Sequence, residues 1–191
     1  DAVQRLYGRA PAAVTVTTNP PGLTVLVDGV SRATPYTFSP ALDSTHTLDV
    51  PAGPQTLNGR AVVYGGWNDN RAASHAITIG RGNGATGSPG AVPAVTVYQA
   101  SFVELLKYEP FVWPAGAGSV VATPAAQAYP PLAGLYYPKR QPVQLQATGQ
   151  GGYHLYRLYT ADGGVSQNPK TTRAPDWVLA YFTAQPVTMI A

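Results

Sequence analysis

The chain has 191 residues, enough for one large domain or two small ones, because domains usually contain about 100–150 residues. Only 11% of its residues are charged, and its 20 Gly and 19 Pro exclude an all-helical fold, because both residues destabilise helix interiors. The net charge of +3 comes from scattered Lys and Arg, so no nucleic-acid partner is expected, and the absence of Cys excludes disulfides and Cys-based metal or redox sites.

Alternating apolar and polar residues predict a series of short strands in the first half. A strand at 14–18 runs into the turn Pro20-Pro21-Gly22. A second strand at 23–27 precedes Asp28-Gly29, a pair typical of a type I′ hairpin turn, in which both central residues have positive φ. Further strands are expected at 36–38, 45–50, 61–67, 75–79 and 93–103. The Gly-rich stretch 80–90 predicts a long loop.

A change of composition at 105–111 places the boundary between two modules, because charge and Leu gather there before Pro110. Near 103–108 a single helical turn is the most that the pattern allows. Strands are expected downstream at 118–124, 142–148, 153–160 and 177–183, with a turn at Asn168-Pro169. Short strands separated by turns predict β-sandwich modules, so the expected fold is all-β. The expected organisation is an N-terminal segment 1–12, a first module 13–106, a linker or interface 107–116 and a second module 117–191.

No run of residues reaches the roughly 18 consecutive apolar positions of a membrane span, so no membrane insertion is expected. The start at Asp1 has no charged and apolar regions of the signal-peptide kind. We therefore expect a mature protein or a fragment of a larger one.

Several short motifs of the first module follow one another in a characteristic order. They are Thr18 to Leu23, Val27-Asp28-Gly29, Thr34-Pro35, His46-Thr47-Leu48, Trp67-Asn68-Asp69 and Ser74-His75. In this order the module resembles immunoglobulin-like modules of bacterial exported and cell-surface proteins, and over 20–50 it is similar to the PEGA type of surface module. The resemblance implies structural roles for Pro21, Gly22, Asp28, Gly29, His46, Trp67, Asp69 and His75.

The second module looks like the divergent B-repeat of bacterial internalin-type surface proteins, a small β-rich, ubiquitin-like unit. The matching positions are Gly118-Ser119-Val120, Pro124, Val143 to Ala147, Gly152-Tyr153, Asn168-Pro169 and Ala180-Tyr181-Phe182. Leu155 and Leu158 stand where Phe and Trp are usual. Together the two resemblances imply a secreted or cell-surface spacer, stalk or adhesion region within a larger chain, with no catalytic residue to carry over.

The residues that could bind a metal do not have the required spacing. His46, His75 and His154 fall on separate predicted strands, and we expect the first two to bond across strands or to turn backbone. The stretch Asn68-Asp69-Asn70 offers one carboxylate, no following Gly and no nearby Glu, so a plain turn is favoured over a calcium site. No metal and no cofactor is expected.

Enzyme activity is not expected either. There is no Gly-x-Ser-x-Gly motif, and the adjacent Ser74-His75 pair is not a triad signature, because triad members meet in space rather than in sequence. Glu104 and Glu109 both lie in the inter-module segment, where no pocket is predicted. The stretch Gly80 to Gly84 precedes a strand rather than a helix, so it predicts a hairpin connection and not a phosphate-binding loop. An intramolecular isopeptide bond could involve only Lys107, with Glu104 or Glu109 as its carboxylate.

The 12 Tyr, 3 Trp and 4 Phe residues are the feature with most functional potential, because exposed rings stack on sugars or anchor interfaces. Trp67 and Trp177 are expected in the cores, and Trp113 between the modules. Tyr129, Tyr136 and Tyr137 lie in a Pro-rich run and are the candidates for binding a glycan or a protein, with Trp113 as a fourth. Three functions remain open: a non-catalytic spacer or adhesion pair, a carbohydrate- or protein-binding module, and an accessory C-terminal region of an exported hydrolase.

Overall fold

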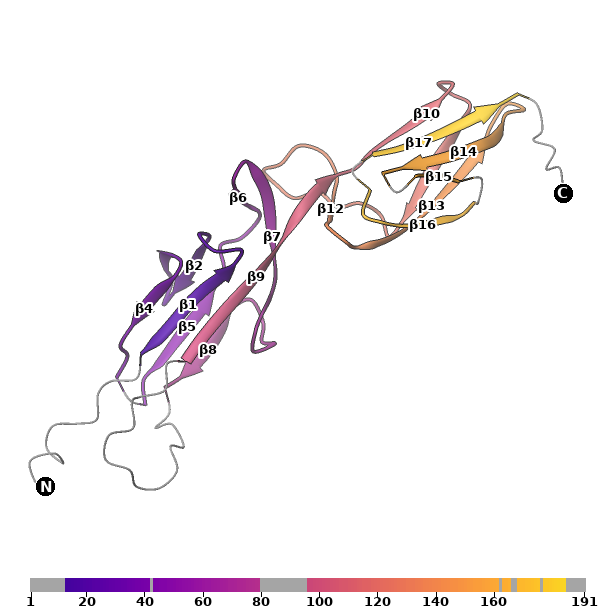
Figure 1. Cartoon of the computed structure of the whole chain (residues 1–191). Coiled ribbons are helices and arrows are strands. Elements are labelled where there is room, and N and C mark those ends of the chain that lie inside the picture. The colour runs from indigo at the N-terminus through magenta and orange to yellow at the C-terminus, as the bar shows by residue number, and fades with distance from the viewer. Residues whose placement is uncertain are drawn as a thin grey trace, which may run out of the picture. The chain divides into compact units, whose positions relative to one another are not determined.

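The computed structural model describes residues 13–41, 43–79, 96–161, 163–165, 168–175 and 177–184. These residues form strands and turns without a helix, which confirms the all-β prediction (Figure 1). Accordingly, no described segment is a helix long and apolar enough to cross a membrane. The predicted segment 1–12 and the predicted loop 80–90 lie outside the described residues. The chain divides into two compact units, unit 1 at 1–103 and unit 2 at 104–191.

Unit 1 consists of two sheets. One has the order β4-β1-β9-β7-β6, and the other has the order β3-β2-β5-β8. The strands of the first sheet are β4 (Tyr36–Phe38), β1 (Val14–Asn19), β9 (Thr96–Lys107), β7 (Arg60–Trp67) and β6 (Gln55–Leu57). The strands of the second are β3 (Val30–Ala33), β2 (Thr24–Val27), β5 (Thr45–Asp49) and β8 (His75–Thr78). In the first sheet β1 runs parallel to β9, with Val14 opposite Thr96.

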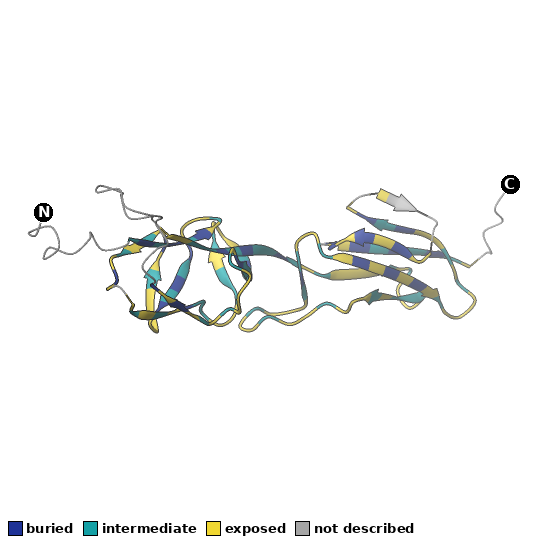
Figure 2. Ribbon diagram, turned by 90° about the horizontal axis from the view of Figure 1, so that it is seen from below, coloured by how far each residue is buried: buried dark blue, intermediate teal, exposed yellow. Residues whose placement is uncertain are grey.

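The two sheets of unit 1 enclose one hydrophobic core, which gives the unit a sandwich-like character. The alternation of β1 buries Val14, Val16 and Thr18 and leaves Thr15 and Thr17 partly exposed. Figure 2 shows the same alternation of buried and exposed residues along other strands. Leu48 and Ile77 of the second sheet and Trp67 of the first complete the centre of the core. Each buried aliphatic side chain stabilises the fold by roughly 1.5–3 kcal/mol, so this core is the main source of stability in unit 1.

Two hairpin turns set the register of the neighbouring strands in unit 1. Asp28 and Gly29 have φ angles of 52° and 75°, which confirms the type I′ turn between β2 and β3. Asn58 and Gly59, with φ angles of 51° and 76°, form a second turn with the same positive-φ pair between β6 and β7. The second turn carries the same Asx-Gly signal, but the hairpin and β6 were not predicted.

Unit 2 also consists of two sheets around one core. The first has the order β10-β17-β14-β15 and the second the order β11-β13-β16. The first contains β10 (Glu109–Trp113), β17 (Trp177–Thr183), β14 (His154–Thr160) and β15 (Gly163–Val165). The second contains β11 (Gly118–Thr123), β13 (Pro142–Gly149) and β16 (Lys170–Arg173), while β12 (Tyr136–Pro138) pairs with Leu105 to Lys107 of β9. Val143, Leu145, Leu158, Val178 and Phe182 form the centre of the core.

Two predictions around the module boundary are corrected by the strands. Residues 103–107 belong to β9 and do not form a helical turn. The segment 107–116, expected as a linker or interface, contains β10, which pairs with β17 inside unit 2. Pro110 obscured this strand, since a proline cannot donate to a ladder, but β10 is an edge strand, where proline is tolerated.

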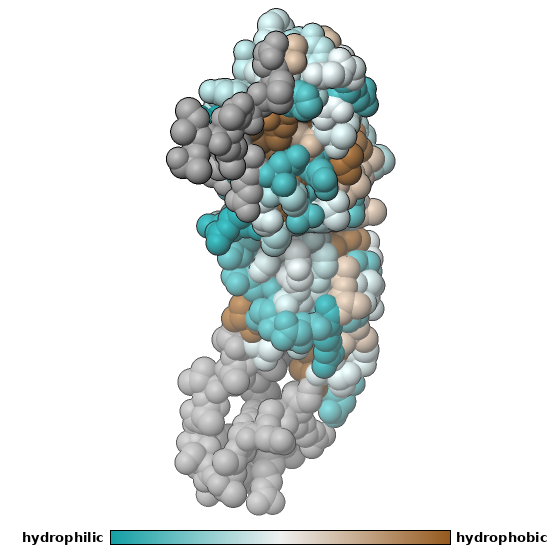
Figure 3. Space-filling model, turned by 90° about the vertical axis from the view of Figure 1, so that its right-hand side faces the viewer, coloured by the Kyte–Doolittle hydropathy of each residue, from teal (hydrophilic) through white to brown (hydrophobic). Residues whose placement is uncertain are grey.

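On the face drawn in Figure 3, hydrophobic residues lie in small separate patches among hydrophilic and intermediate ones. Hydrophilic and intermediate residues therefore supply much of this face (Figure 3).

Candidate functional site

Aromatic side chains gather on the outward face of the β10-β17-β14 part of unit 2. In the parallel register of β10 and β17, Phe111 lies opposite Leu179 and Trp113 opposite Tyr181. Residues opposite each other in a ladder project from the same side of the sheet. Val112, between the two aromatic residues of β10, packs on the core of unit 2, so its neighbours face outward.

The rings on this face are exposed to solvent. The exposed fractions are 56% for Phe111, 59% for Trp113 and 41% for Trp177. In β17 the residues that alternate with Trp177 and Tyr181 are fully buried, so the strand has one face in the core and one outside. Trp177 was expected in the core, and this prediction is wrong.

A β-bulge adds a further ring from β14. The register of β14 against β17 shifts between Leu155 and Arg157, and the intervening Tyr156 is 43% exposed. A bulge re-aims a side chain, and here two consecutive residues, Tyr156 and Arg157, are both exposed. The ring of Tyr156 stands edge-to-face on that of Tyr181, with centroids 5.6 Å apart and an interplanar angle of 81°. We call Phe111, Trp113, Tyr156, Trp177, Leu179 and Tyr181 the aromatic face.

The aromatic face carries little charge. Glu109 lies opposite Trp177 at one end, and Arg157 lies opposite Tyr181 at the other. The carboxylate of Glu109 is 2.5 Å from the ammonium of Lys107 and raises the pKa of that lysine. Because Lys107 pairs with Glu109, the charge that remains among the described residues of this face is that of Arg157.

The structure separates the sequence-predicted binding residues. Trp113 is on the aromatic face, whereas Tyr136 and Tyr137 are on β12, and Tyr129 is half-buried in the preceding loop. Tyr137 is only 1% exposed and its hydroxyl donates to the carbonyl of Pro124 at 2.7 Å, so it is a core residue and not the surface residue expected. The hydroxyl of Tyr136 donates to the carbonyl of Ala133 at 3.1 Å.

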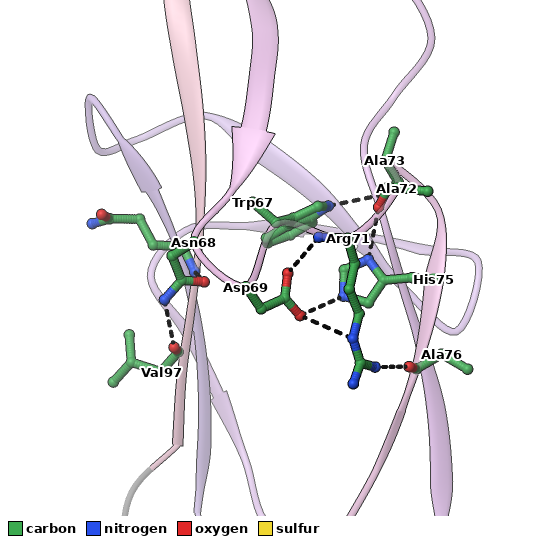
Figure 4. A network of polar contacts seen from close by, with 10 residues as sticks. Trp67, Asn68, Asp69, Arg71, Ala72, Ala73, His75, Ala76 and Val97 are labelled. Carbon is green, nitrogen blue, oxygen red and sulfur yellow. Dashed lines mark hydrogen bonds and ion pairs between the residues drawn. The ribbon is translucent and has the colours of Figure 1, made fainter.

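Asn68, Asp69 and Asn70 form a turn, as expected, rather than an open set of oxygen ligands. The side-chain amide of Asn68 donates to the Val97 carbonyl at 3.1 Å and its oxygen accepts from the Gln99 N–H at 2.9 Å (Figure 4). Asp69 accepts from the Arg71 N–H at 3.2 Å. In the part of the chain that the structure describes, no group of three or more His, Asp or Glu residues could hold a metal ion.

Trp67 and His75 pack together beside this turn. The Trp67 ring is 3% exposed, which confirms its predicted core position, and its indole N–H donates to the Ala73 carbonyl at 2.9 Å. His75 donates from Nδ1 to the Ala72 carbonyl at 2.8 Å, the turn-backbone bond that was predicted, and its Nε2 lies 3.3 Å from Asp69 Oδ2 (Figure 4). These contacts fix the turn that connects β7 to β8.

Asp28, His46 and Ser44 form a line of hydrogen bonds with the atom order of a serine-hydrolase triad. His46 Nδ1 lies 2.7 Å from Asp28 Oδ2, and His46 Nε2 lies 2.9 Å from Ser44 Oγ. The serine hydroxyl is also 2.6 Å from the Ala41 carbonyl, which can only accept, so the hydroxyl hydrogen points there. The bond to Ala41 therefore uses the one hydroxyl hydrogen that a general base at His46 would have to take.

The remaining motif residues have backbone roles. Asn168 pairs with both backbone groups of Ala147, donating at 2.7 Å and accepting at 3.0 Å, and so takes the place of a strand residue beside β13. Gly152 has a φ of 82° in the turn before Tyr153, and Gly22 has a φ of 93° in the turn after Pro21. Asn168-Pro169 forms a bend, as predicted.

The isopeptide alternative does not fit the described residues. Its bond needs a buried lysine, but the Lys107 side chain is 53% exposed and paired with Glu109. Glu104, the second carboxylate considered, accepts from Lys139 at 2.6 Å. The buried lysine is Lys170, whose ammonium donates to the Thr160 hydroxyl and the Gly163 carbonyl.

Sequence reasoning missed most of the aromatic face, namely Phe111, Tyr156, Trp177, Leu179 and Tyr181. The only signal was the spacing of Trp177, Leu179 and Tyr181 at every second position of a predicted strand. Because the alternating set Val178, Ala180 and Phe182 is equally apolar, the pattern could not say which set faces the core.

Comparison with known proteins adds no relative: no family model, no curated protein and no solved structure matches the chain.

Proposed function

We propose that the chain is a non-catalytic recognition region of an exported or cell-surface bacterial protein, in which the aromatic face of unit 2 binds a partner. The observation that carries the proposal is the exposure of Phe111, Trp113 and Trp177 on one side of one sheet. Unit 1 serves as a spacer module, and other domains of a larger chain are its neighbours.

The energetics of the exposed rings support a binding role. A tryptophan that is fully covered buries roughly 150–250 Å². At about 25 cal/mol per Å², the half of each ring that remains exposed represents about 2–3 kcal/mol of gross stabilisation on contact. Trp113 and Trp177 together are thus sufficient to anchor an interface, because a few aromatic residues usually carry most of the binding energy.

The spacer role of unit 1 rests on different features. Its described aromatic residues pack in or against its core: Trp67 and Phe102 are buried, and Tyr36, Phe38, Tyr64 and Tyr98 are partly buried. The resemblance of its turn motifs to bacterial surface modules supports an extracytoplasmic location. Two sheets around a single core are the architecture that such a module requires.

The non-catalytic part of the proposal is supported by Ser44. Its hydroxyl hydrogen is directed to the Ala41 carbonyl, so His46 cannot take it without breaking a 2.6 Å bond. We infer that Asp28 and His46 bond to each other to hold the β2–β3 turn against β5.

The test compares the wild-type chain with a Trp113→Thr/Trp177→Thr double variant, in which threonine preserves strand propensity. The wild type, the double variant and the control variant Val121→Thr are immobilised and exposed to neutral glycans, anionic glycans, single-stranded DNA and lipid vesicles. Val121→Thr is the matched control, because Val121 is also 59% exposed but lies on β11, in the other sheet. Binding that the double variant loses and the control retains supports the proposal. Ligands that bind all three proteins equally contradict it.

A further inference from the structure

We propose that the ligand of the aromatic face is a neutral polysaccharide chain several sugars long. This inference rests on the proposed recognition function and adds the chemical class and the minimum length of the ligand. It follows from the charge, the spacing and the polar surroundings of the rings.

The charge of the aromatic face excludes a polyanion as its preferred ligand. Nucleic acids and acidic polysaccharides are bound by groups of cations that neutralise several phosphates or carboxylates. On the outward side of β10, β17 and β14, Glu109 is already paired with Lys107, so the described residues of this face offer the single cation Arg157 and no group of cations. A neutral ligand does not need such a group of cations for binding.

The spacing of the two tryptophans matches an extended ligand. Glu109 is opposite Trp177, and Trp113 is four residues further along β10, opposite Tyr181. Four residues along a strand and one step between strands place the Cα atoms of Trp177 and Trp113 roughly 14 Å apart. This distance exceeds the length of a single hexose, so one sugar cannot cover both rings and a chain can.

The chemistry of a sugar ring fits the arrangement of aromatic and charged side chains on the aromatic face. A pyranose presents C–H groups on its flat sides and hydroxyls around its edge. The flat sides match the indole of Trp113 and the phenol of Tyr181, and the hydroxyls can bond to Arg157 and Glu109 at the two ends. Binding of the sugar by these contacts requires no covalent step, as expected of a non-catalytic binding region.

The test uses two polymers with the same backbone and different charge. The full chain is run on native gels that contain hydroxyethyl cellulose or carboxymethyl cellulose, together with neutral galactomannan, arabinoxylan and amylose. The variants are Trp113→Thr, Trp177→Thr and the control Val121→Thr. Sedimentation at several concentrations is measured in parallel to detect pairing of two copies through the same face.

We expect at least one neutral polymer to retard the wild-type chain and the control, with the dissociation constant raised roughly tenfold or more in each tryptophan variant. Oligosaccharides of that polymer should bind more tightly as they lengthen, and Trp177→Thr should abolish this dependence on length. Retardation only by the anionic polymer, lost in the variants, would overturn the neutral-glycan inference and leave the recognition function standing. A dimer that the variants abolish, or no effect of any polymer, would also overturn the inference.

Discussion

Trp113 of β10 lies directly opposite Tyr181 of β17, and the two side chains project from the same side of the sheet. Tyr181 in turn contacts Tyr156, which a bulge in β14 turns toward it. Three strands distant in sequence thus contribute rings to one surface. Because the opposite side of each strand packs on the core of unit 2, these rings are held by a fixed backbone and not by a loop.

Asp28 makes the stability of unit 1 sensitive to acid. The hydrogen bond from His46, and then that from the Thr47 N–H, lower the pKa of Asp28 below its ordinary value of 3.8. A carboxyl whose pKa is lower in the folded state stabilises the fold above its unfolded pKa, and this contribution is lost as the pH falls through the folded pKa. Asp28→Asn should therefore flatten the loss of stability below about pH 4, measured by urea unfolding at about pH 7 and about pH 3.

The size of that effect is limited, because the Asp28 side chain is 49% exposed and solvent screens its ion pair. Asp43→Asn serves as the control, since the hydrogen bonds that lower the pKa of Asp28 come from His46 and Thr47. An acid dependence that is identical in Asp28→Asn and wild type would contradict the assigned hydrogen bonds.

Tyr108 makes unit 2 sensitive to alkali. Burial, with a smaller effect from Tyr137, raises the pKa of Tyr108 to about 12. The unfolded chain releases this proton near pH 10, so the stabilisation is complete below that pH and is lost as the pH rises toward 12. We expect a late-titrating tyrosine in the ultraviolet absorbance of the folded protein, and Tyr108→Phe should remove it.

Two phenylalanine substitutions at neighbouring rings should have opposite consequences at neutral pH. The rings of Tyr108 and Tyr137 meet edge-to-face with centroids 5.3 Å apart. The hydroxyl of Tyr108 is buried without a hydrogen-bond partner among the described residues, so Tyr108→Phe should be neutral or stabilising. Tyr137→Phe loses the bond to Pro124 and should lower the free energy of unfolding by about 1–2 kcal/mol. Equal urea midpoints for the two variants would refute this assignment.

Gly118 should tolerate no side chain. A Cβ at this position would lie 2.6 Å from Cζ of Phe182 and closer still to the carbonyl of Thr148. Neither neighbour can move freely, because Thr148 is in the β13 backbone and Phe182 is fully buried. We expect Gly118→Ala to destabilise unit 2 by roughly 2–4 kcal/mol, whereas Ser119→Ala on the same strand should change little. Thermal unfolding followed by circular dichroism would measure both.

Ser44 should be unreactive, although it stands in line with His46 and Asp28. Its hydroxyl hydrogen is directed to the Ala41 carbonyl, so the oxygen is not activated as a nucleophile. We expect no adduct at Ser44 after treatment with a fluorophosphonate, as measured by mass spectrometry of peptides. An adduct at Ser44 that His46→Ala abolishes would contradict the non-catalytic proposal.

The sequence predicted the strands whose two faces differ in polarity. Alternation in Val14 to Thr18 and in Pro142 to Thr148 located β1 and β13, and Asp28-Gly29 located the first hairpin. The short strands β12 and β16 were not predicted, although the equally short β4 was expected at 36–38. In β16 the inward positions are Lys170 and Thr172, which a pattern of apolar residues cannot reveal.

The candidate site was less predictable than the fold. Trp113 was selected as a binding residue, but Trp177 was assigned to the core because both faces of β17 are apolar. Tyr156 depends on a bulge, which is a property of the pairing between β14 and β17 and not of either strand alone. The line of Ser44, His46 and Asp28 likewise exists only after β2 and β5 have paired.

The most direct test of the account is oxidative footprinting of the three tryptophans with N-bromosuccinimide, in the absence and presence of a saturating neutral polysaccharide that retards the chain. In the free protein, Trp113 and Trp177 should be oxidised and the buried Trp67 spared. With the polysaccharide bound, the account predicts that both exposed tryptophans are protected and that their oxidation rates fall roughly tenfold or more. Binding that leaves Trp113 and Trp177 as reactive as in the free protein would contradict the central claim that the aromatic face is the recognition surface.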